Sequence, residues 1–232
     1  MTGSWDKSWG KIYQTQEYGA RYPNEDLVRF MAGLYKSLPP EERKKVRVLE
    51  VGCGRGANIW YLAREGFSTY GIDGSETAVQ MCRQRLEAEG LKAEVSVGDI
   101  IALPYSEGFF DVVIDVAAIQ HNTPENIARI FSEIHRVLRK NGHLFSLVRS
   151  AKDYQFGRGR EVAENTFTDI PEGDAKGVGT IHFFTVPEIE GFLKGKFGEL
   201  KLEYSERTIE GMSRVIAHYI IVAAKQVKHG VV

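Results

Sequence analysis

The residues of this chain best suited to chemistry begin with an acid and a glycine-rich loop. A short apolar run ends at Glu50, and glycines follow at positions 52, 54 and 56. Glycines let the backbone turn sharply and approach a ligand more closely than a residue with a Cβ allows. Asp73 ends the next apolar run, and its carboxylate could accept both hydroxyls of a ribose. These residue types predict a site for a nucleoside-containing cofactor.

The loop alone fits two cofactors equally well. It matches the Gly-x-Gly-x-x-Ala pattern of dinucleotide sites, and it also matches Gly-x-Gly-x-Gly preceded by an acid. The first pattern favours a nicotinamide dinucleotide, and the second favours an adenosine-type cofactor. A tight turn without a ligand is the third interpretation, although three close glycines carry an entropic cost that a simple turn does not need.

Two histidines are candidates for proton transfer. His121 follows the apolar run at 110–116, and His182 follows a long irregular stretch. The ordinary pKa of histidine lies near neutrality, so either imidazole could act as a general base for a hydroxyl nucleophile. The alternative for each is a structural role in a loop or turn. Cys53 is most simply a small residue in a tight loop, because no partner that would activate a nucleophile accompanies it.

The elements that must position these residues alternate between strand and helix. The run at 110–116 is almost entirely apolar, as expected of a strand covered on both faces. Helical spacing appears at Val79, Cys82 and Leu86, after a good N-cap at Ser75. Such alternation predicts an α/β fold with a parallel, doubly wound sheet and helices on both faces. The predicted strands are 47–51, 67–72, 93–97, 110–116 and 143–148. The helices between them are 57–65, the helix that starts after Ser75, and a helix from Pro124 that ends at Asn141-Gly142.

The flanking segments divide the 232 residues into parts of one predicted domain. Residues 1–40 form an aromatic N-terminal segment with a helix from Asn24, and 46–149 form the cofactor-binding core. Residues 150–185 are an irregular substrate-side insertion, because 150–181 are polar, glycine-containing and weakly patterned. Residues 186–225 are predicted as a helix and an antiparallel strand pair.

Composition excludes several classes of protein. Lys and Arg number 30 against 31 Asp and Glu, which is unlike the basic composition of nucleic-acid binders. No apolar run approaches the length of a membrane span, and the N-terminus lacks the features of a secretory signal. Two cysteines form no disulfide framework, and no metal-ligand spacing is visible. We therefore expect a cytoplasmic protein, monomeric or homodimeric, that binds neither nucleic acid nor membrane nor metal.

Five ordered stretches, spanning about residues 46–149, separate the two cofactors. They are Val48-Leu-Glu-Val-Gly-Cys-Gly-Arg-Gly, Tyr70-Gly-Ile-Asp-Gly-Ser, Gly98-Asp-Ile-Ile-Ala-Leu-Pro-Tyr, Phe110-Asp-Val-Val-Ile-Asp and Leu138-Arg-Lys-Asn-Gly-His-Leu. Together they resemble the motifs of the class I S-adenosylmethionine-dependent methyltransferases. The resemblance implies a Rossmann-like sheet of seven strands in the order 3-2-1-4-5-7-6, mostly parallel with an antiparallel last strand. It also implies S-adenosylmethionine as cofactor and S-adenosylhomocysteine as product.

The resemblance assigns expected roles to individual residues. Glu50 would lie near the amino group of the methionine tail, Asp73 would hold the ribose hydroxyls, and Asp99 would accept from the adenine amino group. Acids are the right residue type beside a cationic tail, because buried charge needs a partner. Further expected cofactor contacts are Gly52, Cys53, Gly54, Gly56, Gly74, Ser75, Ile100 and Val116, together with Asp115, for which packing is an equal alternative.

The two irregular segments are expected to close the pocket. In the N-terminal segment, Tyr13 and Tyr18 could face the sulfonium by cation–π attraction, and Arg21 could pair with the cofactor carboxylate. Around the insertion, Gln120, Tyr154 and Arg158 are candidates for substrate contact. The alternatives are packing on the sheet flank for the first segment and a solvated charge run for the second.

The expected function is methyl transfer from S-adenosylmethionine to a small molecule. The amino-methylating members of this family often carry Asn/Asp-Pro-Pro-Tyr/Phe after the fourth strand, whereas this chain has Asp115-Val-Ala-Ala. That departure argues against a base or amide nitrogen and slightly favours oxygen, with an amine or carbon still open. The alternatives are a non-catalytic S-adenosylmethionine-binding protein and an NAD-dependent oxidoreductase.

Overall fold

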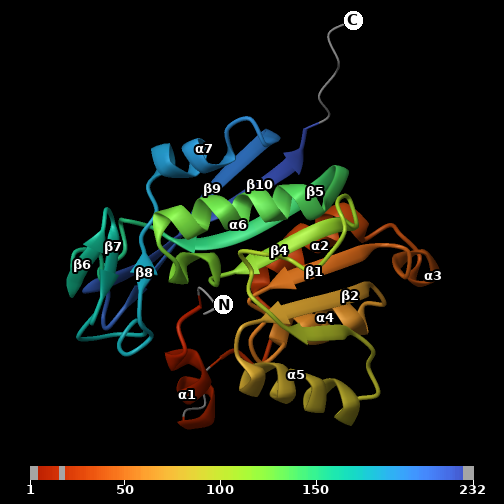
Figure 1. Ribbon diagram of the computed structural model, residues 1–232, viewed down its shortest axis with the longest axis horizontal. Helices are drawn as coiled ribbons and strands as arrows, with labels where there is room; N and C mark the ends of the chain where they lie inside the picture. The colour runs from red at the N-terminus through yellow and green to blue at the C-terminus, as the bar shows by residue number, and fades with distance from the viewer. Residues whose placement is uncertain (1–4, 16–18, 227–232) are drawn as a thin grey trace, which may run out of the picture.

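A seven-stranded sheet forms the centre of the protein, as a computed structural model describing residues 5–15 and 19–226 shows (Figure 1). The strand order is β3-β2-β1-β4-β5-β10-β9, with β1 to β5 parallel and β10 antiparallel to both of its neighbours. Counted within this sheet, the order is the expected 3-2-1-4-5-7-6. The strands are β1 (Arg47–Val51), β2 (Ser68–Asp73), β3 (Glu94–Val97), β4 (Phe110–Val116), β5 (Leu138–Arg149), β9 (Phe197–Ile209) and β10 (Arg214–Lys225).

Helices cover both faces of the sheet, and adjacent strand residues divide between the two layers. Leu49 and Val113 pack with the apolar stripe of α6, while Val48 and Val112 pack with Leu27 on the opposite face. Side chains alternate across a strand, so this division explains why β1 and β4 are apolar at successive positions. The helices are α1 (Ser8–Thr15), α2 (Glu25–Tyr35), α3 (Pro40–Arg43), α4 (Ala57–Arg64), α5 (Glu76–Ala88), α6 (Pro124–Val137) and α7 (Val186–Leu193), with a short 3₁₀ turn η1 (Ile119–His121) after β4.

The end of α6 differs from the prediction. The helix stops at Val137, and Leu138 already pairs with Phe110 in the sheet. Asn141 adopts a φ of +58°, and the β4–β5 register shifts before it resumes at His143. Asn141 and Gly142 therefore lie within β5, at an irregularity of its pairing with β4. The predicted helix end there is wrong, because pairing with β4 overrides the helical pattern after Val137.

Residues 150–185 contain a second sheet where the sequence predicted an irregular stretch. Strands β6 (Arg160–Ala163), β7 (Thr166–Thr168) and β8 (Ile181–His182) pair antiparallel in that order. This small sheet lies at one end of the main sheet (Figure 1). It has an apolar cluster of its own, which includes Phe167 and Phe183 and also Ile12 of α1. The N-terminal helix and the inserted segment are thus joined by a shared core.

Within the described part of the chain, no helix is long and apolar enough to cross a membrane.

Candidate functional site

A cavity of about 440 Å³ opens at the carboxyl ends of β1, β2 and β4. This is the edge where ligands bind in open α/β sheets. Its walls come from the glycine loop, the β2, β4 and β5 strand ends, β10, the N-terminal segment and the insertion. The lining residues are Trp5, Asp6, Trp9, Tyr13, Gly19, Ala20, Glu50, Gly52, Cys53, Gly54, Arg55, Ala57, Asn58, Asp73, Gly74, Gly98, Asp99, Ile100, Val116, Ala117, Ala118, Gln120, His121, Asn122, Arg149, Asp174 and His218.

The glycine loop is held in a form that side chains would prevent. Gly52 has a φ of +65°, and a Cβ on it would lie 2.2 Å from the Cβ of Ala118. The Gly52 N–H donates to the Ile72 carbonyl at 2.7 Å. Gly56 has a φ of +79° and precedes α4, and a Cβ there would meet the Cys82 Sγ at 2.2 Å. The loop therefore lies tight against β2, the loop after β4 and α5, which leaves its backbone facing the cavity.

Glu50 is a buried acid with one oxygen lacking a partner. Its side chain is 2% exposed, and its Oε1 accepts from the Asn58 amide at 2.6 Å. No hydrogen-bond partner for Oε2 is found among the described residues. Burial raises the pKa of this carboxyl well above its usual range. Because Glu50 lines the cavity, a bound cation would supply the missing partner.

Asp73 and Asp99 follow β2 and β3 on the same wall. Asp73 Oδ2 accepts from the Gly54 N–H at 2.8 Å, and Oδ1 accepts from the Ser75 N–H at 2.8 Å. Each carboxylate oxygen has room for a second donor, so Asp73 could hold the loop and two ligand hydroxyls together. Burial raises its pKa. Asp99 lines the cavity next to Ile100, and its Oδ1 accepts from the Ile101 N–H at 3.1 Å.

His121 lies on the opposite side of the cavity, in η1. Its Nδ1 is 3.0 Å from the Thr180 carbonyl oxygen, which can only accept, so Nδ1 bears the proton and Nε2 carries the lone pair. Trp9 packs edge-on against the ring, with the centroids 4.8 Å apart. Burial lowers the pKa of His121 to about 4. The imidazole is therefore neutral at physiological pH and a weaker base than a free histidine.

The N-terminal segment covers the glycine loop. A Cβ on Gly74 would lie 2.5 Å from the Trp5 ring, and one on Gly54 would lie 2.7 Å from the Tyr13 hydroxyl. Trp5, Trp9 and Tyr13 all line the cavity. Aromatic faces thus close the side opposite the sheet, where they could stabilise a cation and exclude water.

A family model described as a methyltransferase domain matches residues 48–142, from β1 into the irregular part of β5. Over these residues the chain is similar to a methyltransferase domain. The matched residues include the glycine loop, Glu50, Asp73 and Asp99, so this wall of the cavity lies within the region of similarity.

Named methyltransferases match part of the length of this chain. The phthiotriol/phenolphthiotriol dimycocerosates methyltransferase of Mycobacterium leprae is 39% identical over 100 residues, which are 42% of this chain and 36% of the relative. The fatty-acid O-methyltransferase of Mycolicibacterium smegmatis is 36% identical over 123 residues, which are 52% and 43% of the two chains. The ajmaline N-methyltransferase of Rauvolfia serpentina is 35% identical over 101 residues, which are 41% and 35%. The chain thus spans less than half the length of these relatives.

Solved structures share the fold over more of the chain. A methyltransferase from Methanosarcina mazei aligns with a TM-score of 0.65 at 23% identity, covering 78% of this chain and 93% of that one. A 1,6-didemethyltoxoflavin-N1-methyltransferase from Burkholderia thailandensis, solved with S-adenosylhomocysteine, aligns with a TM-score of 0.57 at 17% identity, covering 87% and 82%.

Some of the residues that the sequence predicted as S-adenosylmethionine contacts do not line the cavity. Asp115 is fully buried below the loop after β4, where it accepts from the Ala118 and Ile119 N–H groups at 2.9 and 3.0 Å. It also accepts from the Ser146 hydroxyl, and burial raises its pKa to about 6. The structure thus supports the packing alternative for Asp115. Ser75 caps α5, Gly56 precedes α4, Arg21 is exposed and not among the lining residues, and Tyr18 lies outside the described residues.

His182 also lies outside the cavity. Its ring is fully buried, with Nδ1 2.8 Å from the Thr166 hydroxyl and the ring edge-on to Phe184. Its Nε2 is 3.5 Å from Glu188 of α7. The expectation that His182 faces the pocket is wrong, because β8 turns the side chain toward α7 and the core.

Of the three predicted substrate residues, one lines the cavity and two do not. Gln120 lines the cavity, and its Oε1 accepts from the Arg149 N–H at 2.8 Å. Tyr154 instead packs below Arg214, with the guanidinium 5.0 Å from the ring centroid. Arg158 pairs with Glu172 at 2.8 Å, and neither Tyr154 nor Arg158 is among the lining residues.

Sequence reasoning missed a second set of lining residues. Trp5, Asp6 and Trp9 belong to an aromatic segment whose density was the available signal. Arg149 and His218 meet only through the pairing of β5 with β10, in which they are direct partners. Short-range patterns carry no information about such a pair. The remaining missed residues with side chains suited to polar contact are Arg55, Asn58, Asn122 and Asp174.

His218 should make the folded protein less stable at mildly acidic pH. Its pKa is lowered to about 4, chiefly by burial and then by the charge of Arg149. In the unfolded chain His218 becomes protonated below about pH 6.5, whereas in the folded chain it becomes protonated only near pH 4. The free energy of unfolding therefore falls as pH falls from about 6.5 to about 4. In His218→Asn, the decrease in unfolding free energy between pH 7 and pH 5 should be about 1–2 kcal/mol smaller than in the wild type.

Urea unfolding at pH 7, 6 and 5 would measure this difference. The control is the comparison at pH 7 and above, where the two proteins should show the same slope of stability with pH. An equal loss in wild type and His218→Asn between pH 7 and 5 would show that His218 titrates normally.

Proposed function

We propose that this chain binds S-adenosylmethionine in the cavity and transfers its methyl group to a small molecule. The observation that carries the proposal is Glu50, a buried acid facing the cavity with one unpartnered oxygen. It lies beside a glycine loop that admits no side chain. S-adenosylmethionine, when bound, supplies an electrophilic methyl group on a sulfonium and a zwitterionic amino-acid tail that includes an ammonium group. The residues present fit that group, because the tail would give Glu50 its missing partner.

Three acidic residues would each bind a different part of the cofactor. Glu50 would take the ammonium of the tail, Asp73 would accept from the ribose hydroxyls, and Asp99 would accept from the adenine amino group. Gly74 and Ile100 would lie against the adenine ring. All five residues line the same cavity, which supports these roles.

His121 would orient the acceptor more than deprotonate it. Its Nε2 carries the lone pair and lies 3.5 Å from the Gln120 amide nitrogen, a donor that an acceptor group of the substrate would have to replace or share. Its pKa of about 4 makes it a weak base at neutral pH. Names among the relatives include both an O- and an N-methyltransferase. An oxygen that is already anionic, or an amine that is already neutral, would need no base before it accepts the methyl group. Catalysis would come mainly from alignment and exclusion of water by the aromatic N-terminal segment.

Calorimetry and a turnover assay would test the proposal. S-adenosylhomocysteine should bind with a dissociation constant of about 1–100 μM, equivalent to about 5–8 kcal/mol. NADH should not bind in that range. Tight NADH binding without S-adenosylhomocysteine binding would support the dinucleotide alternative instead.

Turnover separates an enzyme from a binding protein. Release of S-adenosylhomocysteine from S-adenosylmethionine should depend on an added acceptor across a panel of acids, alcohols and amines. Binding without acceptor-dependent release by any member of a broad panel would favour the non-catalytic alternative.

A further inference from the structure

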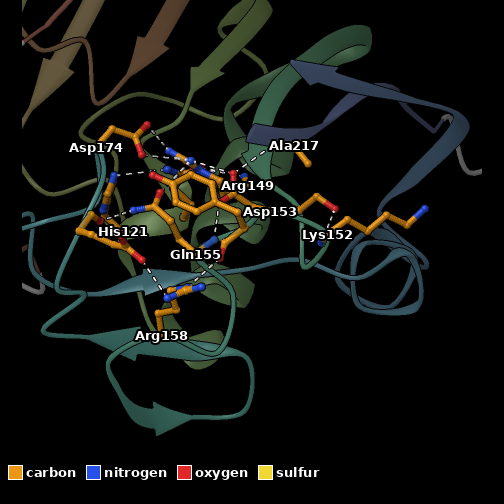
Figure 2. A network of polar contacts seen from close by, with 12 residues as sticks. His121, Arg149, Lys152, Asp153, Gln155, Arg158, Asp174 and Ala217 are labelled. Atoms are coloured by element: carbon orange, nitrogen blue, oxygen red, sulfur yellow. Dashed lines mark hydrogen bonds and ion pairs between the residues drawn. The ribbon is translucent and has the colours of Figure 1, made fainter. Parts of the chain in front are cut away.

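Arg149 places a buried cation in the wall of the cavity beside His121. It is the last residue of β5, it is 5% exposed, and its side chain is enclosed between two aspartates (Figure 2). Asp153 lies on one side of the guanidinium and Asp174 on the other. Arg149, Asp174 and His218 line the part of the cavity away from Asp73 and Asp99. This is the side left for the acceptor.

The hydrogen bonds of Arg149 leave one donor on one edge of its guanidinium group without a partner among the described residues. Nη1 donates to Asp153 at 2.9 Å and to Gln155 at 3.3 Å. Asp174 takes the end of the group, with Nη2 donating to it at 2.7 Å and Nη1 at 3.3 Å. Nε is buried and has no partner among the described residues. The Nε and Nη2 edge, which pairs side-on with a carboxylate, is therefore occupied at only one of its two donors.

The two aspartates differ in how firmly they are held. Asp153 is fully buried, and its oxygens also accept from the Ala217 and Gln155 N–H groups at 3.1 and 2.9 Å. The Asp174 side chain is 50% exposed, and its carboxylate bonds to Arg149. It lies between two glycines with φ of +75° and +76°, at positions 173 and 177. Asp153 already balances the charge of Arg149, so Asp174 is a second anion that can leave without exposing a buried charge.

We propose that Arg149 is the binding site for a carboxylate group of the methyl acceptor, with Asp174 holding Nη2, one of the two donors that this carboxylate would use, until the acceptor binds. The inference rests on the proposed methyl transfer. The acceptor's carboxylate takes Nε and Nη2 side-on, which gives the unpartnered Nε a bond, and Asp174 turns to solvent. The neighbouring His121 and His218 are neutral, so they neither repel the arriving anion nor replace Arg149.

Three probes of similar size would distinguish the charge that this site prefers. Benzoate, benzamide and benzylamine are an anion, a neutral amide and a cation on the same ring, and the cavity is lined by Trp5, Trp9 and Tyr13. Their affinities would be measured by calorimetry on the full chain saturated with S-adenosylhomocysteine. We expect benzoate to bind more tightly than benzamide or benzylamine.

Substitutions then identify the groups responsible. Asp174→Asn should strengthen benzoate binding by about tenfold, because it removes a like charge that competes for Arg149. Arg149→Lys should weaken benzoate binding while leaving benzamide unchanged. Since Arg149 is buried, its variant could lose stability, and Asp174→Asn on the half-exposed segment tests the proposal independently.

Two controls come from the same segment. Asp169→Asn removes an exposed aspartate that pairs with Arg160 at 3.3 Å, and Arg158→Gln removes an arginine outside the cavity. Neither should change benzoate affinity. Unchanged or weaker benzoate binding in Asp174→Asn would overturn the proposal, as would tighter binding of benzylamine than benzoate. S-adenosylhomocysteine affinity is measured separately, so its loss would contradict the proposed function and not the anion site.

Discussion

Gly52→Ala should both destabilise the protein and abolish tight binding of S-adenosylhomocysteine. The new Cβ would lie 2.2 Å from that of Ala118, and the backbone would keep a φ of +65° that alanine adopts only with strain. The neighbouring atoms belong to the loop after β4, so relief requires the glycine loop to move away from it. We expect a loss of about 3 kcal/mol or more in unfolding free energy. The dissociation constant should rise at least tenfold, about 1.4 kcal/mol.

Gly33→Ala is the matched control. Gly33 lies in α2, and a Cβ there would have no heavy atom within 4 Å. The same chemical change should therefore stabilise the helix by about 0.5–1 kcal/mol and leave cofactor affinity unchanged. Thermal unfolding and calorimetry on both variants would measure the two effects. Wild-type affinity in Gly52→Ala would mean that the close approach of this loop does not serve the ligand.

The cofactor side of the site could be predicted from sequence because its residues are close together in the chain. Glu50 and the glycine loop form a single stretch, and Asp73 and Asp99 each follow a strand of the same parallel sheet. Parallel strands bring their carboxyl ends to one edge, so local motifs were enough to place these groups together. The sheet order followed from the same motifs, through their resemblance to a known family.

The side of the cavity proposed for the acceptor could not be predicted, because its residues meet only through long-range packing. Arg149 reaches the cavity because β5 pairs with β10, and Asp174 reaches it through a segment between β7 and β8. The small sheet of β6 to β8 has strands too short to give a clear alternating pattern, and its formation sent His182 into the core. A histidine in a loop-like stretch carries no sign of which way a later strand will turn it.

Glu50→Gln should stabilise the ligand-free protein and weaken its binding of S-adenosylhomocysteine. The Glu50 carboxylate is buried, and one of its oxygens has no partner among the described residues, so ionising it in the empty cavity is unfavourable. Glutamine keeps the shape and removes that cost, which should raise unfolding free energy by about 1–2 kcal/mol at pH 8. A bound ammonium would lose its counter-charge, and affinity should fall by about a hundredfold or more.

The pH dependence of the two proteins separates this explanation from a change in packing. The pKa of Glu50 is raised in the folded state, so folded Glu50 keeps a proton that the unfolded chain has lost above about pH 4.5. Its contribution to stability is greatest below that pH and declines as pH rises through the folded pKa. Wild-type stability should therefore fall relative to Glu50→Gln as pH rises. Wild-type affinity for S-adenosylhomocysteine should increase over the same range, because only the ionised acid pairs with an ammonium.

Glu125→Gln provides the surface comparison for that substitution. Glu125 pairs with Arg129 along α6, and its side chain is 75% exposed, so its loss should change stability by less than about 0.5 kcal/mol and affinity not at all. Calorimetry at pH 6, 7 and 8 on all three proteins would test both effects of Glu50. If Glu50→Gln bound S-adenosylhomocysteine as tightly as wild type at pH 8, the unpartnered oxygen would not serve the cofactor ammonium. The buried acid would then be a cost without a ligand to offset it, and the central argument for the cofactor site would fail.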